Sequence, residues 1–386
     1  MDDQQPPPLP APPPLAPPPI IYAAPPRRTG CSVFWKIFAI VLLVVLCLTL
    51  FSRLLHFSTA VAVTRGHPTV ERNRNLEEVV LEQTNSDNKI AVISVDGIIT
   101  SQGMDRSSMN LVDFISEQLK TAGNDSDVKA VILKVNSPGG EVLASDDINA
   151  AITKFQEDTH KPVVASMGTL AASGGYYISV PCRWIVANEL TITGSIGVIM
   201  DSWNYRTLMD KVGIRPHVFK SGRFKDMLSG EREPDTNKLS PEEQKTREEE
   251  NQMVQSLIDE TFSKFKQVVK IGRTHAAGEN DGKGKALADN WQDYADGRVL
   301  SGRHAMELGF VDELGDFQVA VKRAEKLANI SSASLVEYRV AFDIQSVVSH
   351  LFGKTAAPAL KIDLGIGPPT LQAGCLYYIL PTAVLH

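Results

Sequence analysis

The stretch Lys161–Val180 reads KPVVASMGTLAASGGYYISV, and it joins a predicted strand to a predicted helix through a run of small residues. Its first part, KPVVASMG, is an apolar run typical of a buried strand, and AASGGYYISV opens a helix. Ser173 stands at the junction, where a helix N-terminus offers free backbone N–H groups and the positive end of the helix dipole. Two roles are open for this serine: it is a nucleophile, or it caps the helix.

Strands and helices alternate on both sides of this stretch. Three further apolar runs are typical of buried strands: KIAVISVDG from Lys89, VKAVILKVNSPGG from Val128 and RWIVAN from Arg183. Helical periodicity marks Ala144–Phe155. Such alternation predicts an α/β fold with a largely parallel sheet covered by helices.

The C-terminal half is predicted to be mainly helical. Ser240-Pro241-Glu242-Glu243 is a capping box with proline at the first helical position, so a helix begins there. Shorter helices are expected around Arg303–Leu308 and Phe317–Leu327, and SLVEYRV from Ser334 is a closing strand. The helix after the capping box presents one apolar face, made of Val254, Leu257, Ile258, Phe262, Phe265 and Val269.

The N-terminal region divides by composition. Residues 1–30 are proline-rich, which favours a solvated, disordered tail, and residues 31–55 are apolar enough to predict a transmembrane helix. Arg27, Arg28 and Lys36 favour a cytoplasmic N-terminus. The alternative is a cleaved signal peptide, because Ala60-Val61-Ala62 resembles a cleavage site. We expect a stalk at 56–88, a folded domain at 89–340 and a C-terminal tail at 341–386.

Charge and cysteine content narrow the classes of function. The net charge of −6 gives no indication of nucleic-acid binding. The four cysteines lack the paired spacing of a metal site, so neither a metal nor another cofactor is expected, and a disulfide framework is not indicated. If the domain faces an oxidising compartment, a disulfide between Cys182 and Cys375 is an alternative.

Asn136-Ser137-Pro138-Gly139-Gly140 ends another predicted strand and supplies a second element of a catalytic site. Two consecutive glycines allow backbone conformations that other residues avoid, so this turn can aim an N–H group at the pocket beside Ser173. The Gly174 N–H group is similarly placed to stabilise an oxyanion. The alternative is an ordinary turn at the end of a strand.

The base that would activate Ser173 is the third element. No histidine lies between His160 and His217, and His275 and His304 fall in the helical C-terminal part without supporting context. A lysine can replace histidine if burial keeps its amine neutral. The lysines after Ser173 that come into question are Lys211, Lys220 and Lys225, of which Lys225 lies between apolar residues, with Asp226 expected to point away.

Together these stretches resemble the signal peptide peptidase A family, the S49 serine peptidases, in its short single-domain form. The resemblance covers about residues 89–330 and has six matching stretches: VDGIIT, NSPGG, ASMGTLAASGGYYIS, TGSIGV, KSGRFKDMLS and DGRVLSGRHAMELGFVDELG. It implies a repeated ββα spiral of the kind found in the caseinolytic protease (ClpP) and crotonase families. It also implies that Ser173 is the nucleophile, Lys225 the general base, Ser195 the residue that orients the lysine amine, and Gly174 with Gly139 or Gly140 the oxyanion donors.

The resemblance also implies a biological role and partners. We expect a serine endopeptidase that is anchored in the cell membrane by a single span, with its catalytic domain extracytoplasmic. It would degrade residual signal peptides or other membrane-associated peptides, preferring small or apolar side chains, and form a homo-oligomeric ring in which serine and lysine meet across a subunit boundary. The alternatives are a crotonase-like acyl-thioester enzyme and a non-catalytic membrane scaffold.

Overall fold

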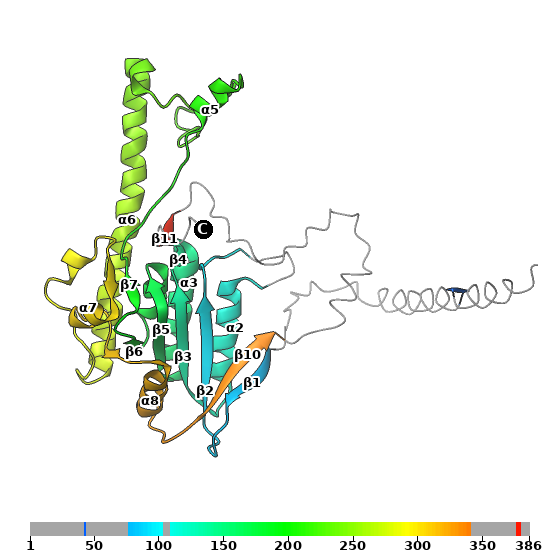
Figure 1. Cartoon of the computed structure of the whole chain (residues 1–386), viewed down its shortest axis with the longest axis vertical. Helices are drawn as coiled ribbons and strands as arrows, with labels where there is room; N and C mark the ends of the chain where they lie inside the picture. The colour runs from blue at the N-terminus through cyan, green and yellow to red at the C-terminus, as the bar shows by residue number, and fades with distance from the viewer. Residues whose placement is uncertain (1–41, 44–75, 103–108, 341–375, 380–386) are drawn as a thin grey trace, which may run out of the picture. The chain divides into compact units, whose positions relative to one another are not determined.

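A computed structural model describes residues 42–43, 76–102, 109–340 and 376–379 of the chain. The chain forms two units, Met1–Asn73 and Arg74–His386, and the second contains the folded domain (Figure 1). The predicted tail at 1–30 and nearly all of the predicted span at 31–55 lie outside the described residues; Leu42 and Leu43 are helical. Within the part of the chain that is described, no helix is both long and apolar enough to cross a bilayer.

A nine-stranded sheet organises the second unit. Its strands are β1 (Leu76–Glu82), β2 (Lys89–Asp96), β3 (Val128–Ser137), β5 (Val163–Ala172), β6 (Trp184–Ala187), β7 (Ile192–Gly194), β8 (Val299–Ser301), β9 (Glu313–Leu314) and β10 (Ser334–Val340). The main path runs β1-β10-β2-β3-β5-β6-β9, and β7 pairs with β5 and β8. All pairs are parallel except β1 with β10 and β7 with β8, so the prediction of a largely parallel sheet is confirmed.

Helices connect the strands and cover both faces of the sheet. They are α2 (Leu111–Asn124), α3 (Val142–Thr159), α4 (Gly174–Ser179), α5 (Arg206–Lys211), α6 (Pro241–Glu279), α7 (Gly302–Glu307) and α8 (Phe317–Leu327), with short 3-10 turns η1 (Thr236–Lys238) and η2 (Trp291–Tyr294). Neighbouring strand residues point to opposite faces. Ala91 and Ile93 of β2 therefore join the core under α2, α3, α4 and α6, whereas Ile90 and Val92 join the core under α8.

Two regions outside the predicted domain take part in the fold. The predicted stalk at 56–88 is wrong at its C-terminal end, because Leu76–Glu82 forms β1 and pairs antiparallel with β10. Its apolar residues alternate too weakly to mark a strand, and pairing with β10 decides the conformation. In the predicted tail at 341–386, Tyr377–Ile379 forms β11, which pairs antiparallel with β4 (Gly139–Glu141).

Helix α6 differs from the prediction in how its apolar face is used. The capping box is present, since the Glu243 N–H donates to the Ser240 hydroxyl and the Glu243 carboxylate accepts from the Ser240 N–H. Phe265 and Val269 are buried, with the Phe265 ring against Tyr177 of α4, but Leu257 is exposed. The first half of α6 extends past the sheet and contacts residues 201–240, which we call the arm and which includes α5 and η1 (Figure 1).

An ion pair inside the core fastens the second half of α6. Arg273 Nη2 lies 2.5 Å from Asp312 Oδ1, and the two side chains are 0% and 1% exposed. Asp312 also accepts from the backbone N–H groups of Ile185 (2.9 Å) and Lys285 (3.0 Å). Loss of the guanidinium would leave a buried carboxylate without its counter-charge.

We predict that Arg273→Met lowers the free energy of unfolding by about 3–5 kcal/mol, because it strands the Asp312 charge in the core. Urea denaturation of the full chain measures this loss. The matched control is Arg298→Met, whose pair with Asp296 is half exposed (49% on each side), so the loss of unfolding free energy should be much smaller. Equal losses in the two variants would contradict the prediction.

Candidate active site

Ser173 occupies a strained turn between β5 and α4. Its φ of 55° and ψ of −117° fall in a region that a residue with a side chain rarely adopts. Backbone hydrogen bonds hold the turn on both sides: the Ser173 N–H donates to the Gly194 carbonyl, and the Tyr177 N–H donates to the Ser173 carbonyl, each at 2.8 Å. These hydrogen bonds therefore maintain a backbone conformation that an unconstrained serine rarely adopts.

The Ser173 hydroxyl takes no part in the fold. The residue is 1% exposed, and Oγ has no hydrogen-bond partner among the described residues. It does not cap α4, which removes the structural role that the sequence left open. A buried polar group without a partner destabilises a protein, so an unpaired hydroxyl in a strained turn is typical of a functional group.

The glycine turn after β3 lies directly against the Ser173 turn. Gly139 has a φ of +100°, and a Cβ added to it would lie 2.6 Å from the Gly174 nitrogen. The Gly139 N–H donates to the Ser137 hydroxyl at 3.1 Å. The Ile99 N–H donates to the Gly139 carbonyl (2.9 Å), and the Ile99 carbonyl accepts from the Glu141 N–H (2.8 Å). Ile99 therefore occupies one edge of β4. The opposite edge, where Gly140 is the register partner of Tyr378, pairs with β11.

Ser195 lies at the end of β7, beside the same turn. Strand β7 pairs with β5 so that Gly194 is opposite Ala172, which places Ser195 next to the residues that hold Ser173. Ser195 is buried, has a φ of 51°, and donates its N–H to the Arg298 carbonyl at 2.7 Å. The structure thus brings Ser173, Ser195 and the glycines together.

Lys225 is not part of this cluster within one chain. It lies on the arm, is exposed, and has no side-chain partner among the described residues. Lys220, by contrast, forms an ion pair with Asp226 at 2.8 Å. Partial burial alone would raise the pKa of Asp226, but the hydrogen bond from Lys220 and the charge of Arg232 lower it below its usual value. Of these two lysines, Lys225 is therefore the one that does not pair with Asp226.

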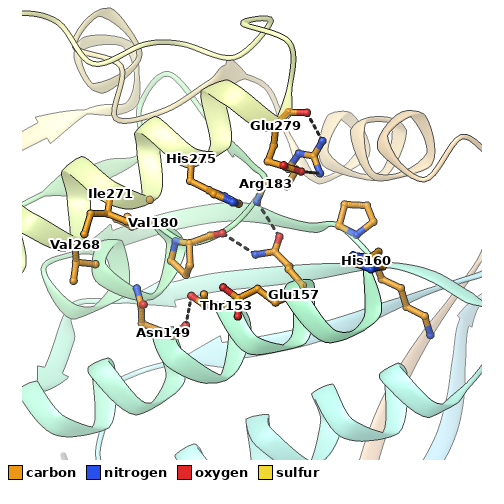
Figure 2. A pocket seen from close by; sticks show the side chains of 15 residues that line it. Asn149, Thr153, Glu157, His160, Val180, Arg183, Val268, Ile271, His275 and Glu279 are labelled. Carbon is orange, nitrogen blue, oxygen red and sulfur yellow. Dashed lines mark hydrogen bonds and ion pairs between the residues drawn. The ribbon is translucent and has the colours of Figure 1, made fainter.

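The histidines considered from the sequence lie elsewhere. A cavity of about 560 Å³ between α3, α6 and the turn after α4 has His160 and His275 in its wall, and Ser173 does not line it (Figure 2). His217 packs against Phe219 on the arm, and His304 packs against Tyr294. Cys182 is free and buried, and burial raises the pKa of its thiol.

Strand β11 is the part of the site that the sequence analysis missed. It lies between β4 and Ile199, which forms an isolated antiparallel bridge with Tyr377. The two hydrogen bonds of this bridge, Tyr377 N–H to Ile199 carbonyl and the reverse, are both 3.1 Å long. The apolar run LYYIL was the signal, but nothing in the sequence indicated which strand it would pair with.

Comparison with known proteins shows which family the chain resembles. The model of peptidase family S49 matches residues 155–331. A relative from Enterococcus faecium, named as a signal peptide peptidase SppA, is 34% identical over 69% of this chain and 72% of its own length. A Methanocaldococcus jannaschii relative, named as a protease, is 37% identical over 70% of this chain and 76% of its own length. The chloroplastic serine protease SPPA of Arabidopsis thaliana is 30% identical over 68% of this chain and 36% of its own length.

These relatives decide between the classes of function that the sequence left open. A crotonase-like acyl-thioester enzyme and a non-catalytic scaffold are set aside, because the family model is that of a peptidase family and these three relatives are named as peptidases or proteases. The chain belongs to peptidase family S49, and it is a serine peptidase.

Proposed function

We propose that the chain is a membrane-anchored serine endopeptidase that uses a Ser/Lys dyad to degrade residual signal peptides and other membrane-associated peptides. The observation that carries the proposal is the Ser173 hydroxyl, which is buried in a strained turn without a partner. The substrate class comes from the name of the Enterococcus faecium relative. The anchor is the apolar segment 31–55, with the N-terminus cytoplasmic and the catalytic domain outside.

The dyad forms between two subunits of a homo-oligomeric ring. Lys225 reaches the Ser173 turn of a neighbouring subunit, which accounts for its exposed position on the arm of its own chain. A surface rich in large apolar side chains supports such a contact, because monomers rarely expose one. The exposed apolar residues of the arm are Trp203, Tyr205, Leu208, Val212, Ile214, Val218, Phe219 and Leu228.

In the proposed reaction each of these groups has one role. The neutral Lys225 amine removes the proton from Ser173 Oγ, and Oγ attacks the peptide carbonyl. The Gly174 and Gly140 N–H groups stabilise the oxyanion, since the Gly139 N–H is already bonded to Ser137. The Lys225 ammonium then protonates the leaving amine, and water hydrolyses the acyl ester. Ser195 holds the lysine amine in position, and burial at the subunit boundary favours the neutral amine.

We assign the domain to the repeated ββα spiral shared by the ClpP and crotonase families. Strand β3, strand β4 and helix α3 supply one such unit: a strand of the main sheet, a short strand that leaves it, and a helix that returns. This unit supports the assignment because it places the glycine turn at the sheet edge where Ser173 lies.

We predict that Ser173→Ala lowers kcat for peptide hydrolysis by about 10⁴-fold or more, because the nucleophile is lost. The measurement uses the full chain in detergent with a fluorogenic peptide, together with labelling by a fluorophosphonate. Ser331→Ala, at an exposed serine far along the chain, is the control and should keep both activity and labelling. An active or labelled Ser173→Ala chain would refute the assignment of the nucleophile.

We predict that Ser173→Ala and Lys225→Ala chains are each inactive alone but regain activity when they are refolded together. In a randomly mixed ring, about a quarter of the sites combine an intact Ser173 with an intact neighbouring Lys225, so about a quarter of wild-type activity should return. No recovery would indicate a dyad within one chain. Lys220→Ala is the control for the base: if it is inactive while Lys225→Ala is active, the base is misassigned.

A further inference from the structure

A row of alternating charges lies beside Lys225 on the arm. We call it the charge row, and its members in order are Lys220, Asp226, Arg232, Glu250 and Arg247. Lys220 Nζ lies 2.8 Å from Asp226 Oδ1 and 2.9 Å from Oδ2. Arg232 Nε lies 3.7 Å from Asp226 Oδ2. Asp226 thus pairs with Lys220 and Arg232, although a third basic residue, Lys225, directly precedes it in the chain.

Helix α6 fixes the far end of the charge row. The side chain of Glu250 is 3% exposed, and its carboxylate accepts two hydrogen bonds from Arg232 Nη1, at 2.7 and 2.9 Å. Arg247, one turn earlier on α6, adds a longer ion-pair contact of 3.8 Å to Glu250. A buried carboxylate is stable only with such partners, so Arg232 has little freedom to move. Arg232 Nη1 also donates to the Asp226 carbonyl at 3.3 Å, which fixes the turn that follows Lys225.

The pairing of Asp226 matters because of the chemistry required of Lys225. A general base has to be neutral before it can accept a proton. A free carboxylate within about 4–6 Å of an amine favours the charged ammonium form, whereas a carboxylate already paired with cations has a much smaller effect. Asp226 directly follows Lys225, so an unpaired Asp226 side chain would be free to turn toward the amine. Its two partners therefore remove an obstacle to catalysis.

The other charged groups of the described residues that face the charge row or the Ser195 turn have partners of their own. These pairs are Glu243 with Ser240, Arg223 with Glu249 and, beside Ser195, Arg298 with Asp296. The hydrogen bonds from Ser240, with smaller effects from the charges of Arg232 and Lys220, lower the pKa of Glu243. Asp226 is therefore the carboxylate whose pairing decides whether a free anion lies next to Lys225.

We propose that Lys220 is a positioning residue for catalysis: together with Arg232 it binds the Asp226 carboxylate, and so prevents this carboxylate from stabilising the ammonium form of Lys225. The proposal rests on the proposed function, because it takes Lys225 as the base. It gives the two lysines different charge states, with Lys220 as a permanent cation and Lys225 as the neutral amine that meets Ser173 of a neighbouring subunit. Lys220 itself touches neither substrate nor nucleophile.

The test is the pH dependence of kcat/KM for a fluorogenic peptide hydrolysed by the full chain. In Lys220→Met the acid limb of the profile should move to higher pH by about 0.5 to 1 unit, because the freed Asp226 favours the Lys225 ammonium and more alkaline solution is needed to remove its proton. Lys220 is the member of the row to replace, since loss of Arg232 would leave Glu250 buried without its closest counter-charge. An unchanged acid limb in Lys220→Met would overturn the proposal.

A second substitution shows whether the shift passes through Asp226. In the Lys220→Met chain, Asp226→Asn should move the acid limb back to lower pH by about 0.5 to 1 unit, whereas in the wild type, where the carboxylate is paired, it should move it by less than about 0.2 unit. Equal shifts in the two backgrounds would indicate independent charge effects and would also overturn the proposal. The position of the limb is insensitive to a loss of folded protein, which lowers the rate equally at every pH.

Lys238→Met is the matched control. It also removes one positive charge from the arm, but Lys238 pairs with Glu233 (3.7 Å) and Asp235 (3.8 Å) rather than with Asp226. Its acid limb should coincide with that of the wild type. A shift as large as that of Lys220→Met would overturn the proposal, because it would indicate a general effect of net charge.

Lys225→Ala separates a failure of this proposal from a failure of the proposed function. If Lys225→Ala hydrolyses the peptide as the wild type does, Lys225 is not the base and the proposed function fails. If Lys225→Ala is inactive and the acid limb of Lys220→Met stays in place, the proposed function stands and the role of Lys220 is refuted.

Discussion

Two backbone turns meet at the site with no side chain between them. Gly139 and Gly174 approach so closely that a Cβ on Gly174 would lie 3.1 Å from the Gly139 Cα. The parallel pairing of β3 with β5 brings the ends of both strands to one edge of the sheet, and glycine lets the turns touch there. The strained Ser173 turn, the edge of β4 that pairs with β11, and so the position of β11, all depend on this contact.

The sequence predicted the parts that depend on local pattern. Apolar runs such as Val163–Ala172 marked the buried strands, and the capping box marked the start of α6. Ser173 and the glycine turn were also found, because small residues at the end of a buried strand are visible in the sequence. The conformation of Ser173 was not visible: the φ of 55° is held by the hydrogen bonds that Ser173 donates to the Gly194 carbonyl and accepts from the Tyr177 N–H, and these form only in the folded domain.

The remaining parts depend on contacts between distant segments. Strand β1 was taken for a stalk because its own apolar pattern is weak, and its partner β10 lies far along the chain. Strand β11 was missed for the same reason, because its partners, Gly139–Glu141 and Ile199, lie far from it along the chain. The apolar face of α6 was correct as a pattern, but a pattern does not distinguish a face that meets the sheet from one that stays exposed, as Leu257 does.

Helix α6 connects the folded core to the arm, and this limits which mutations in α6 the protein can tolerate. Its 39 residues are fastened at both ends, by Arg232 to Glu250 on the arm side and by Arg273 to Asp312 in the core. One inserted residue between these ends would turn the arm by about 100° and move it by about 1.5 Å. Substitutions in the exposed middle of α6 are therefore tolerated more readily than insertions or deletions, so relatives with the same site should differ there in sequence but agree in length.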